Sequence, residues 1–531
     1  MSRRIRATAS VAALALLAPG AALADEPDAG ADIAPAQAGQ GSDNVSFITN
    51  LQFPEVVEGG GFNATDLDFH RYPVEADEDV RTLPPQAGDR PPARARDRAL
   101  GGDAGDRDVA TRDFAFVGTA LNGMHVVDIT DREDPQLVAR YDCRVSQADV
   151  FVFEQGDRVL AAYSLDAVSQ NQPVEESACH ADNDLVGDDT RGTFLVDITD
   201  PYDPESVSFL PMRKGTHQVT VHPSGNYVYN SAAVLVTTEP GTIEVWDVGA
   251  EATPEAPELV DELQLLTGLD SHDLTFSEDG SRFYTAALTH SLVVDSSDPT
   301  DNRILGRVVD PAVNIHHDAH AVTVDTPLGE REYLLIGDEL AGAAGTGVCP
   351  GGGIHVFDIT GDLERLPVKV GAFFIPEVRV SPGLETCTAH VLDVQPDEQL
   401  ISIAWYNAGV RILDYSGLSG LGPAGLSVGL TPRMGSLTPG IQEVGHFQFP
   451  DSDLWSAKVP EVEDDGSFYI YGGDVRRTLD VFRYDATVEA QEDGGSWVDP
   501  RQALTIARTA GGQLREDDGN PFTCLVARRG A

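Results

Sequence analysis

The chain has 531 residues, with 86 acidic against 36 basic side chains and a formal net charge of -50. So acidic a surface repels phosphate backbones, which excludes nucleic acid as the expected partner. The same charge is typical of an adaptation of the whole surface for solubility, and it leaves calcium as a candidate ligand of local acidic loops.

Residues 1–24 predict a secretory signal peptide. Arg3, Arg4 and Arg6 precede an apolar run at 11–17, and the small-residue cleavage site Ala-Leu-Ala follows at 22–24. This run is too short to span a bilayer as a helix, and no later stretch is long and apolar enough. We therefore expect an exported monomer in the periplasm, outside the cell or at the cell surface, with no membrane span.

The rest of the chain divides by composition. Residues 25–43, rich in Ala, Gly, Asp and Pro, lack an apolar period and predict a flexible linker. Alternating apolar and polar residues recur from 44 to 485, interrupted at 76–112 by a stretch rich in Pro, Arg and Asp that predicts a long loop. Residues 486–531 follow as a C-terminal extension.

The recurring unit is a β-branched run that ends at Asp, followed by Thr and often a second Asp. Clear copies stand at 124–131, 193–200 and 354–361. Because Asp and Pro stop a strand and fix a turn, each copy predicts two adjacent antiparallel strands. A second pair precedes them, as at 272–276 and 281–285. Four strands per unit make the blade of a β-propeller.

Counting the units predicts the whole fold. They begin near residue 61 and then near Ala148, His217, His272, His320, His390 and Trp455, which makes seven. The last unit lacks a fourth strand, whereas residues 44–51 are a strand without a blade. We therefore predict an all-β protein, a seven-bladed β-propeller of four-stranded antiparallel blades whose ring is closed by the N-terminal strand.

Five cysteines in an exported chain favour disulfides over free thiols. Cys143 with Cys179 and Cys349 with Cys387 are the pairs nearest in sequence, and Cys524 is left over. The connectivity stays open at this point.

The run of apolar residues, Asp, Ile, Thr and Asp resembles the LVIVD repeat of exported and surface bacterial proteins, which are taken to be β-propellers and generally lack an assigned activity. The likeness covers most of residues 44–485 and implies the fold. The sequence Ser-His-Asp-Leu at 271–274 is also similar to an inner strand of the selenium-binding protein and methanethiol oxidase propellers, where histidines contribute to a copper site. The cysteine-based selenium motif of that family is not evident here.

Histidines stand at one place in four successive units: His217, His272, His320 and His390. Equivalent positions of a propeller lie side by side around its axis, so we predict a partial ring of imidazoles at one mouth of the channel. The remaining units have Thr65, Asp149 and Trp455 at this place, which makes the ring one-sided.

Imidazole binds copper, zinc and iron, so the ring predicts a transition-metal site. His316, His317 and Asp318, just before His320, are further candidate ligands or proton-transfer groups. Asp182, Asp184, Asp188 and Asp189 are candidate calcium ligands in one acidic loop. His125 and His355 lie inside predicted third strands, where we expect packed side chains.

Two functions fit this pattern. The first is an exported propeller that binds a transition metal or a small ligand, with metal-dependent oxidoreductase as the activity if the protein is an enzyme. The second is a non-catalytic scaffold that engages a surface protein or glycan and whose histidines are structural. In that case the aspartates that end the third strands, such as Asp128 and Asp197, are the candidate partners of the histidines.

Overall fold

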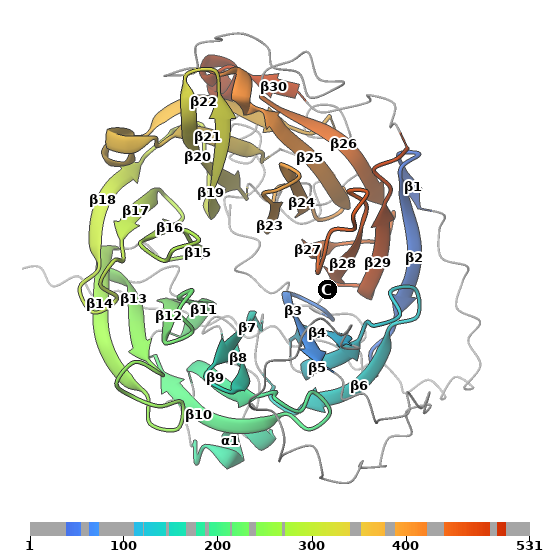
Figure 1. The fold of residues 1–531 in the computed structure, drawn as a ribbon, viewed down its shortest axis with the longest axis vertical. Helices are drawn as coiled ribbons and strands as arrows, with labels where there is room; N and C mark the ends of the chain where they lie inside the picture. Colours follow the sequence, from blue (N-terminus) through green and yellow to red (C-terminus); the bar gives the residue numbers. More distant parts are fainter. Residues whose placement is uncertain are drawn as a thin grey trace, which may run out of the picture. The chain divides into compact units, whose positions relative to one another are not determined.

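Each repeat folds into one antiparallel sheet, and the sheets stand as blades around a common axis (Figure 1). Blade 1 consists of β3 (Leu67–Pro73), β4 (Thr111–Thr119), β5 (Gly123–Asp128) and β6 (Gln136–Tyr141). Blade 2 consists of β7 (Val150–Gln155), β8 (Arg158–Leu165), β9 (Gly192–Asp197) and β10 (Glu205–Pro211). Blade 3 consists of β11 (Thr216–Val221), β12 (Tyr227–Ala232), β13 (Pro240–Asp247) and β14 (Glu258–Thr267).

The later blades follow the same order from the axis outward. Blade 4 consists of β15 (Leu274–Phe276), β16 (Arg282–Ala286), β17 (Ser291–Asp295) and β18 (Arg303–Val308). Blade 5 consists of β19 (His316–Thr326), β20 (Gly329–Asp338), β21 (Ile354–Asp358) and β22 (Val368–Phe374). Blade 6 consists of β23 (Leu392–Gln395), β24 (Leu400–Ala404), β25 (Val410–Gly417) and β26 (Gly440–Gln448), with the short β1 (Gln40–Gly41) added outside β26.

The N-terminal strand closes the ring. Blade 7 takes β27 (Leu454–Lys458), β28 (Phe468–Asp474) and β29 (Thr478–Tyr484) from the end of the chain, and its fourth strand is β2 (Val45–Leu51). The predicted seven-bladed propeller, with four-stranded antiparallel blades and an N-terminal closure, is confirmed.

The computed structural model describes residues 39–54, 63–73, 111–120, 122–144, 148–165, 177–185, 191–212, 215–232, 240–267, 271–339, 352–376, 388–421, 440–488 and 496–505. The predicted signal peptide, most of the linker and of the long loop, and Cys349, Cys387 and Cys524 lie outside these residues. Cys143 and Cys179 form a disulfide.

The described helices with defined bounds are short: α1 (Ala178–Asp182), η4 (Gly361–Arg365) and η5 (Leu418–Gly420). Residues 500–505 are helical as well. None of the described helices is long and apolar enough to cross a membrane. In the C-terminal extension, β30 (Ser496–Val498) pairs with β22 and becomes a fifth strand of blade 5. Gly371 and Gly440 make room for Trp497, because a Cβ at either position would collide with its indole ring.

The aspartates that end the third strands hold the following turns. Asp128 accepts the main-chain N–H of Thr130 at 3.0 Å and binds Arg112 of the second strand at 2.9 Å. Asp197 accepts the N–H of Thr199 at 2.9 Å in the same way. These carboxylates therefore serve the turn, as expected for Asp after a strand, and have partners other than the ring histidines.

Polar side chains on the inner strands join each blade to the next. Asp393 of blade 6 accepts the main-chain N–H of Val459 in blade 7 at 2.7 Å, and Lys458 of blade 7 binds Asp66 just before blade 1 at 2.7 Å. We call the side chains of this kind the inter-blade belt: Asp68 to Val152, Asp149 to Val219, Gln218 to Leu274, Thr275 to Ala319, Asp318 to Leu392, Asp393 to Val459, and Lys458 to Asp66. Apolar clusters fill the spaces between neighbouring blades behind this belt.

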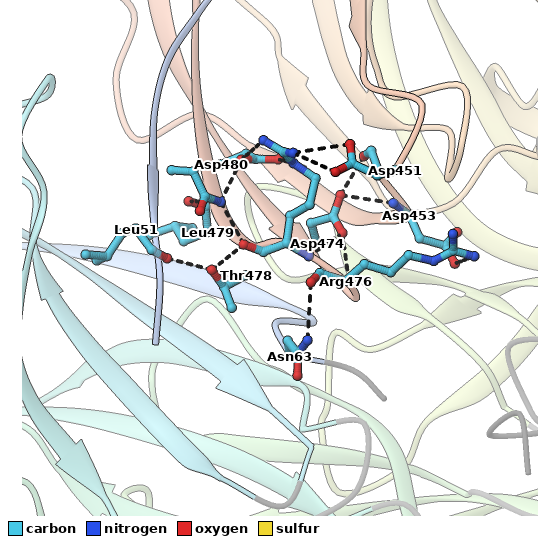
Figure 2. A network of polar contacts seen from close by, with 12 residues as sticks. Leu51, Asn63, Asp451, Asp453, Asp474, Arg476, Thr478, Leu479 and Asp480 are labelled. Carbon is cyan, nitrogen blue, oxygen red and sulfur yellow. Dashed lines mark hydrogen bonds and ion pairs between the residues drawn. The ribbon is translucent and has the colours of Figure 1, made fainter. Parts of the chain in front are cut away.

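Polar contacts lock the closing strand onto blade 7 (Figure 2). Asn50 of β2 donates to Asp480 of β29 at 2.8 Å and to the carbonyl of Arg477 at 2.7 Å. Arg477 pairs in turn with Asp480 at 2.8 Å. The hydroxyl of Thr478 donates to the carbonyl of Leu51 at 2.6 Å. The first and the last strand of the propeller in the sequence, β2 and β29, are therefore bonded to each other within blade 7.

Candidate metal centre

A β-bulge near the start of the inner strand recurs around the propeller. In blade 5 the pairing of β19 with β20 shifts between His316 and Asp318, which leaves His317 as the extra residue. A register shift also surrounds His217 in blade 3 and Trp455 in blade 7. A bulge re-aims the side chain of the extra residue, and here it turns these side chains toward those of neighbouring blades.

Four imidazoles from four consecutive blades meet in a row. The ring centroid of His217 lies 3.9 Å from that of His272, which precedes β15 of blade 4. The ring of His272 lies 4.1 Å from that of His317, and His317 lies 4.2 Å from His390, which precedes β23 of blade 6. All four residues are buried, at 5% exposure or less. We call these four side chains the imidazole row.

Two carboxylates flank the row. Asp273 lies 3.0 Å from Nδ1 of His272 and 3.4 Å from Nδ1 of His317. Glu339, which follows β20, lies 3.6 Å from Nε2 of His317. Donor atoms of His217, His272 and Asp273 lie within 4.8 Å of one another, and so do those of His272, His317 and Glu339. With ligand bonds of about 2.0–2.2 Å, small side-chain rotations bring such atoms onto one ion.

Contacts at Nδ1 orient the imidazoles. The carbonyl of Trp455 accepts a hydrogen bond from Nδ1 of His390 at 2.5 Å. A neutral imidazole carries one proton, so this bond leaves a lone pair on Nε2. Among the described residues, Nε2 of His390 makes no hydrogen bond, and it lies 3.9 Å from Glu339. Asp273, when ionised, accepts a hydrogen bond from Nδ1 of His272 at 3.0 Å, which is how metal-binding histidines are oriented. Its other oxygen lies 3.4 Å from Nδ1 of His317.

Burial keeps His272, His317 and His390 in the neutral form that binds metals. It lowers the pKa of His272 and His317 well below the usual range, and the neighbouring imidazoles lower it further. Burial lowers the pKa of His390 to about 4. Burial also raises the pKa of Asp273, and nearby carboxylates raise it further. A divalent cation would offset this repulsion among the carboxylates, so the donor set fits a metal ion.

A small apolar cluster adjoins the row. Leu288, Ile315, Tyr406 and Trp455, one residue from each of blades 4 to 7, pack together. The indole of Trp455 lies 4.4 Å from the ring of His390, and the ring of Tyr406 lies 4.8 Å from it. We call this cluster the apolar cap. It places hydrocarbon surface beside the imidazole of His390.

Tyr406 links the apolar cap to the carboxylate of Glu339. Its hydroxyl donates to Oε1 of Glu339 at 2.6 Å. Tyr406 and Leu288 both adopt a positive φ, 46° and 58°. This conformation costs a non-glycine residue about 1–2 kcal/mol, and it persists at functional sites where the surrounding structure enforces it. The backbone is therefore held in a strained form where the cap meets the row.

The structure separates the seven predicted ligands into two groups. The row contains His217, His272, His317 and His390, whereas His316, His320 and Asp318 lie elsewhere. His320 pairs with Asp318 at 3.1 Å, and Asp318 belongs to the inter-blade belt. His316 binds the hydroxyl of Ser291 at 2.8 Å. His317 takes the place expected for His320, because β19 begins at His316 rather than at His320.

One sequence signal points to the observed register. The pair His317-Asp318 matches His272-Asp273 better than His320-Ala321 does. Asp149, expected at the ring position of blade 2, instead accepts the N–H of Val219 in the inter-blade belt. Glu339 and Tyr406 carry no comparable signal, because they stand after second strands and reach the row only through the tertiary fold.

The other predicted residues have separate roles. His125 and His355 are buried within their strands, as expected: His125 stacks on Phe53 at 4.3 Å, and His355 lies 2.7 Å from the ammonium of Lys369. Of the acidic loop, positions 188 and 189 lie outside the described residues. His180 in that loop faces Cys179.

No family model and no curated protein matches this chain. Solved structures that resemble it include the β-propeller domain of Cps50 (Swd1) from Myceliophteria thermophila, with 9% identity, TM-score 0.39, and coverage of 70% of this chain and 93% of that one. A putative 6-phosphogluconolactonase from Bacteroides uniformis has 12% identity, TM-score 0.38, and coverage of 58% and 79%. Sqt1 from Saccharomyces cerevisiae has 8% identity, TM-score 0.40, and coverage of 70% and 82%.

Proposed function

We propose that this propeller binds one transition-metal ion through the imidazole row and works as a metal-dependent oxidoreductase. The observation that carries the proposal is the convergence of four buried imidazoles from four blades. The centroids of neighbouring rings in the row lie 3.9 to 4.2 Å apart. Asp273 lies within ligand-sharing distance of His217 and His272, and Glu339 lies within the same distance of His272 and His317.

The donor set selects the class of metal. Imidazole nitrogens suit iron, copper and zinc, whereas calcium and magnesium prefer oxygen. The ring nitrogens of His217, His272 and His317 are the proposed ligands, with Glu339 as a further oxygen donor. His390 is the proposed fourth nitrogen ligand, because its ring lies 4.2 Å from that of His317. Iron or copper would supply one-electron chemistry, which no side chain of the row supplies by itself.

The remaining groups of the site have defined tasks in this proposal. Asp273 orients the imidazoles through their Nδ1 atoms, and Tyr406 holds Glu339 through its hydroxyl. The same hydroxyl is a proton donor one hydrogen bond away from the ligands. The apolar cap excludes water from this side of the row.

Metal analysis tests the proposal. The full chain is loaded with Fe²⁺, Cu²⁺ or Zn²⁺, dialysed, and its metal content measured by mass spectrometry. We expect one tightly bound ion per chain, lost in His272→Ala and kept in His222→Ala, a control histidine in the β11–β12 turn. The Cu²⁺ form should show nitrogen hyperfine splitting in its electron paramagnetic resonance spectrum. Absence of stoichiometric metal, or its retention in His272→Ala, would favour the non-catalytic scaffold.

Export and family membership also belong to the proposal. Residues 1–24 support a signal peptide, and the recurring Asp-Ile-Thr-Asp motif supports a place among the LVIVD-repeat propellers. Mass spectrometry of the chain after expression in a bacterium with a periplasm tests the first point, because export predicts a mature chain that starts near Asp25.

A further inference from the structure

A second group of metal-binding side chains lies in and beside blades 1 and 2, away from the imidazole row in sequence. Cys143 follows β6, and Cys179 and His180 belong to α1, which stands between β8 and β9. Donor atoms of the three residues lie within 4.8 Å of one another. All three residues are buried, at 1% exposure or less, and the two sulfurs are joined as a disulfide.

His180 is positioned to act together with the sulfurs. Its Nδ1 lies 3.3 Å from Sγ of Cys179 and 2.8 Å from the hydroxyl of Ser177. When this hydroxyl donates, Nδ1 carries the lone pair with which an imidazole binds a metal. Burial lowers the pKa of His180 and so keeps its ring neutral. A plain structural disulfide needs no such partner.

We propose that Cys143, Cys179 and His180 form a second metal site when the two cysteines are reduced, and that this site takes a thiophilic cation, Zn²⁺ or Cu⁺. Two thiolates and one imidazole are the donors that such ions prefer. A dithiol that reduces the disulfide supplies two electrons and two protons and is itself oxidised to a disulfide. The two thiols then release their protons as the cation binds.

The cation and the S–S bond are alternative cross-links at the same place. Each ties the end of β6 in blade 1 to α1 of blade 2. The apolar side chains around the cysteines, among them Tyr163 and Phe194, shield the pair from solvent. The choice is therefore made while the chain folds: an oxidising compartment gives the disulfide, and a reducing one that contains the metal gives the metal-linked form.

The test uses the full chain produced in a reducing cytoplasm and handled without oxygen. His272→Ala with His317→Ala removes metal bound by the imidazole row, and Cys349, Cys387 and Cys524 are replaced by Ser to remove the other thiols. Competition with a chromophoric chelator then measures binding of Zn²⁺ and, in a separate arm, of Cu⁺. We expect one equivalent of one of these ions, with no binding by the oxidised chain. Cd²⁺ in place of Zn²⁺ should give a sulfur-to-metal charge-transfer band.

Variants decide the outcome. Cys143→Ser combined with Cys179→Ser should abolish binding, and His180→Ala should weaken it and shift the Cd²⁺ band. Circular dichroism shows whether each variant folds, and if the double cysteine variant does not fold, His180→Ala and His180→Gln carry the test. Binding that is unchanged without His180 or without both cysteines overturns the proposal. A disulfide that forms even in the reducing cytoplasm overturns it as well.

Discussion

Histidines in one strand of blade 5 have unlike roles because a bulge separates them. His317 is the extra residue of the bulge and joins the imidazole row, whereas His320 pairs with Asp318 within the strand. His316 binds Ser291 of blade 4. At the scale of single residues, the direction of a side chain decides its chemistry, and residue type alone does not.

Replacing these two histidines in turn checks the register of the site. His317→Ala removes a proposed ligand and should weaken metal affinity more than about tenfold, since even the outer hydrogen-bond partners of metal ligands change affinity by 10–100-fold. His320→Ala should leave affinity unchanged, because its partner is Asp318. Titration of both variants with the same metal measures the difference. Equal losses in the two variants would contradict the assigned row.

Protonation of His125 should lower the stability of the folded protein in acid. Burial, aided by Arg140, lowers its pKa from 6.5 to about 4 in the folded protein. Between these values the unfolded chain binds the proton more tightly, so the contribution to stability is complete above pH 6.5 and is lost as the pH falls toward 4. The loss amounts to about 3 kcal/mol at most.

The variant His125→Phe keeps a ring that can stack on Phe53 and removes this titration. Urea unfolding from pH 8 to pH 4.5 should show a shallower decline in stability for the variant than for the unmodified chain. Other buried histidines contribute equally to both proteins, so the difference between the two curves isolates residue 125. Parallel curves would show that His125 does not titrate as described.

Inner strands of the propeller carry polar side chains that bond to main-chain groups of the neighbouring blade. Each blade meets the next near the axis, where the first strand of a sheet has main-chain groups without a partner inside its own blade. The inter-blade belt satisfies several of these groups, as Asp149 does for Val219 and Asp393 for Val459. Acidic residues near the axis are therefore explained by the assembly of the blades, and they need not be ligands.

Substitutions of Asp393 test how much the inter-blade belt contributes to the stability of the fold. Asp393→Ala leaves the N–H of Val459 without its acceptor and should cost about 1–3 kcal/mol. Asp393→Asn keeps an acceptor and removes the carboxylate, whose pKa burial raises to about 6. Because the folded protein holds that proton more tightly, the carboxylate lowers stability as the pH rises from 3.8 to about 6. Asp393→Asn should then be at least as stable as the unmodified chain at pH 8.

Chemical unfolding of both variants at pH 5 and pH 8 checks this prediction. Asp393→Asn should be more stable than Asp393→Ala at both pH values, because only the asparagine keeps an acceptor for the N–H of Val459. An alanine variant as stable as the asparagine variant would mean that the bond to Val459 contributes nothing to folding.

Closure makes the propeller one cooperative body. The strand β2 precedes all other blade strands in the sequence, yet it pairs with β29 near the end of the chain. Val45 lies opposite Tyr484, and Leu51 lies opposite Leu479. The hydrogen bond from Asn50 to Asp480 fastens this pair. The bond from Thr478 to Leu51 fastens it as well (Figure 2). Without β2, blade 7 has an exposed edge and an uncovered apolar face.

Removing residues 44–51 should abolish the single cooperative unfolding transition and promote aggregation through the open edge. A permuted chain in which these residues follow position 485 should restore both properties, because Tyr484 and Val45 are already opposite each other and a short hairpin can join them. Calorimetry and light scattering compare the three chains. A deletion variant that still unfolds cooperatively would show that closure is dispensable.

The number of blades, the strands of each blade and the closing strand follow from the sequence by itself. Alternating residues, such as Gln-Val-Thr-Val at 218–221 in β11, act locally through the two-residue period of a strand. The Asp that ends each third strand also acts locally, through the turn that Asp favours. The sequence by itself also places histidines in four successive blades, and this placement predicts a one-sided site.

Only the tertiary structure decided which side chains meet at that site. A shift of one residue in a strand turns every side chain to the other face. The sequence indicates the bulge that brings in His317 in place of His320 only through the match of His317-Asp318 with His272-Asp273. Glu339 and Tyr406 reach the row from the ends of second strands in different blades. Local patterns determine the blades because strands and turns form between residues that are neighbours in sequence. The site depends on contacts between different blades, and these contacts form only when the propeller is complete.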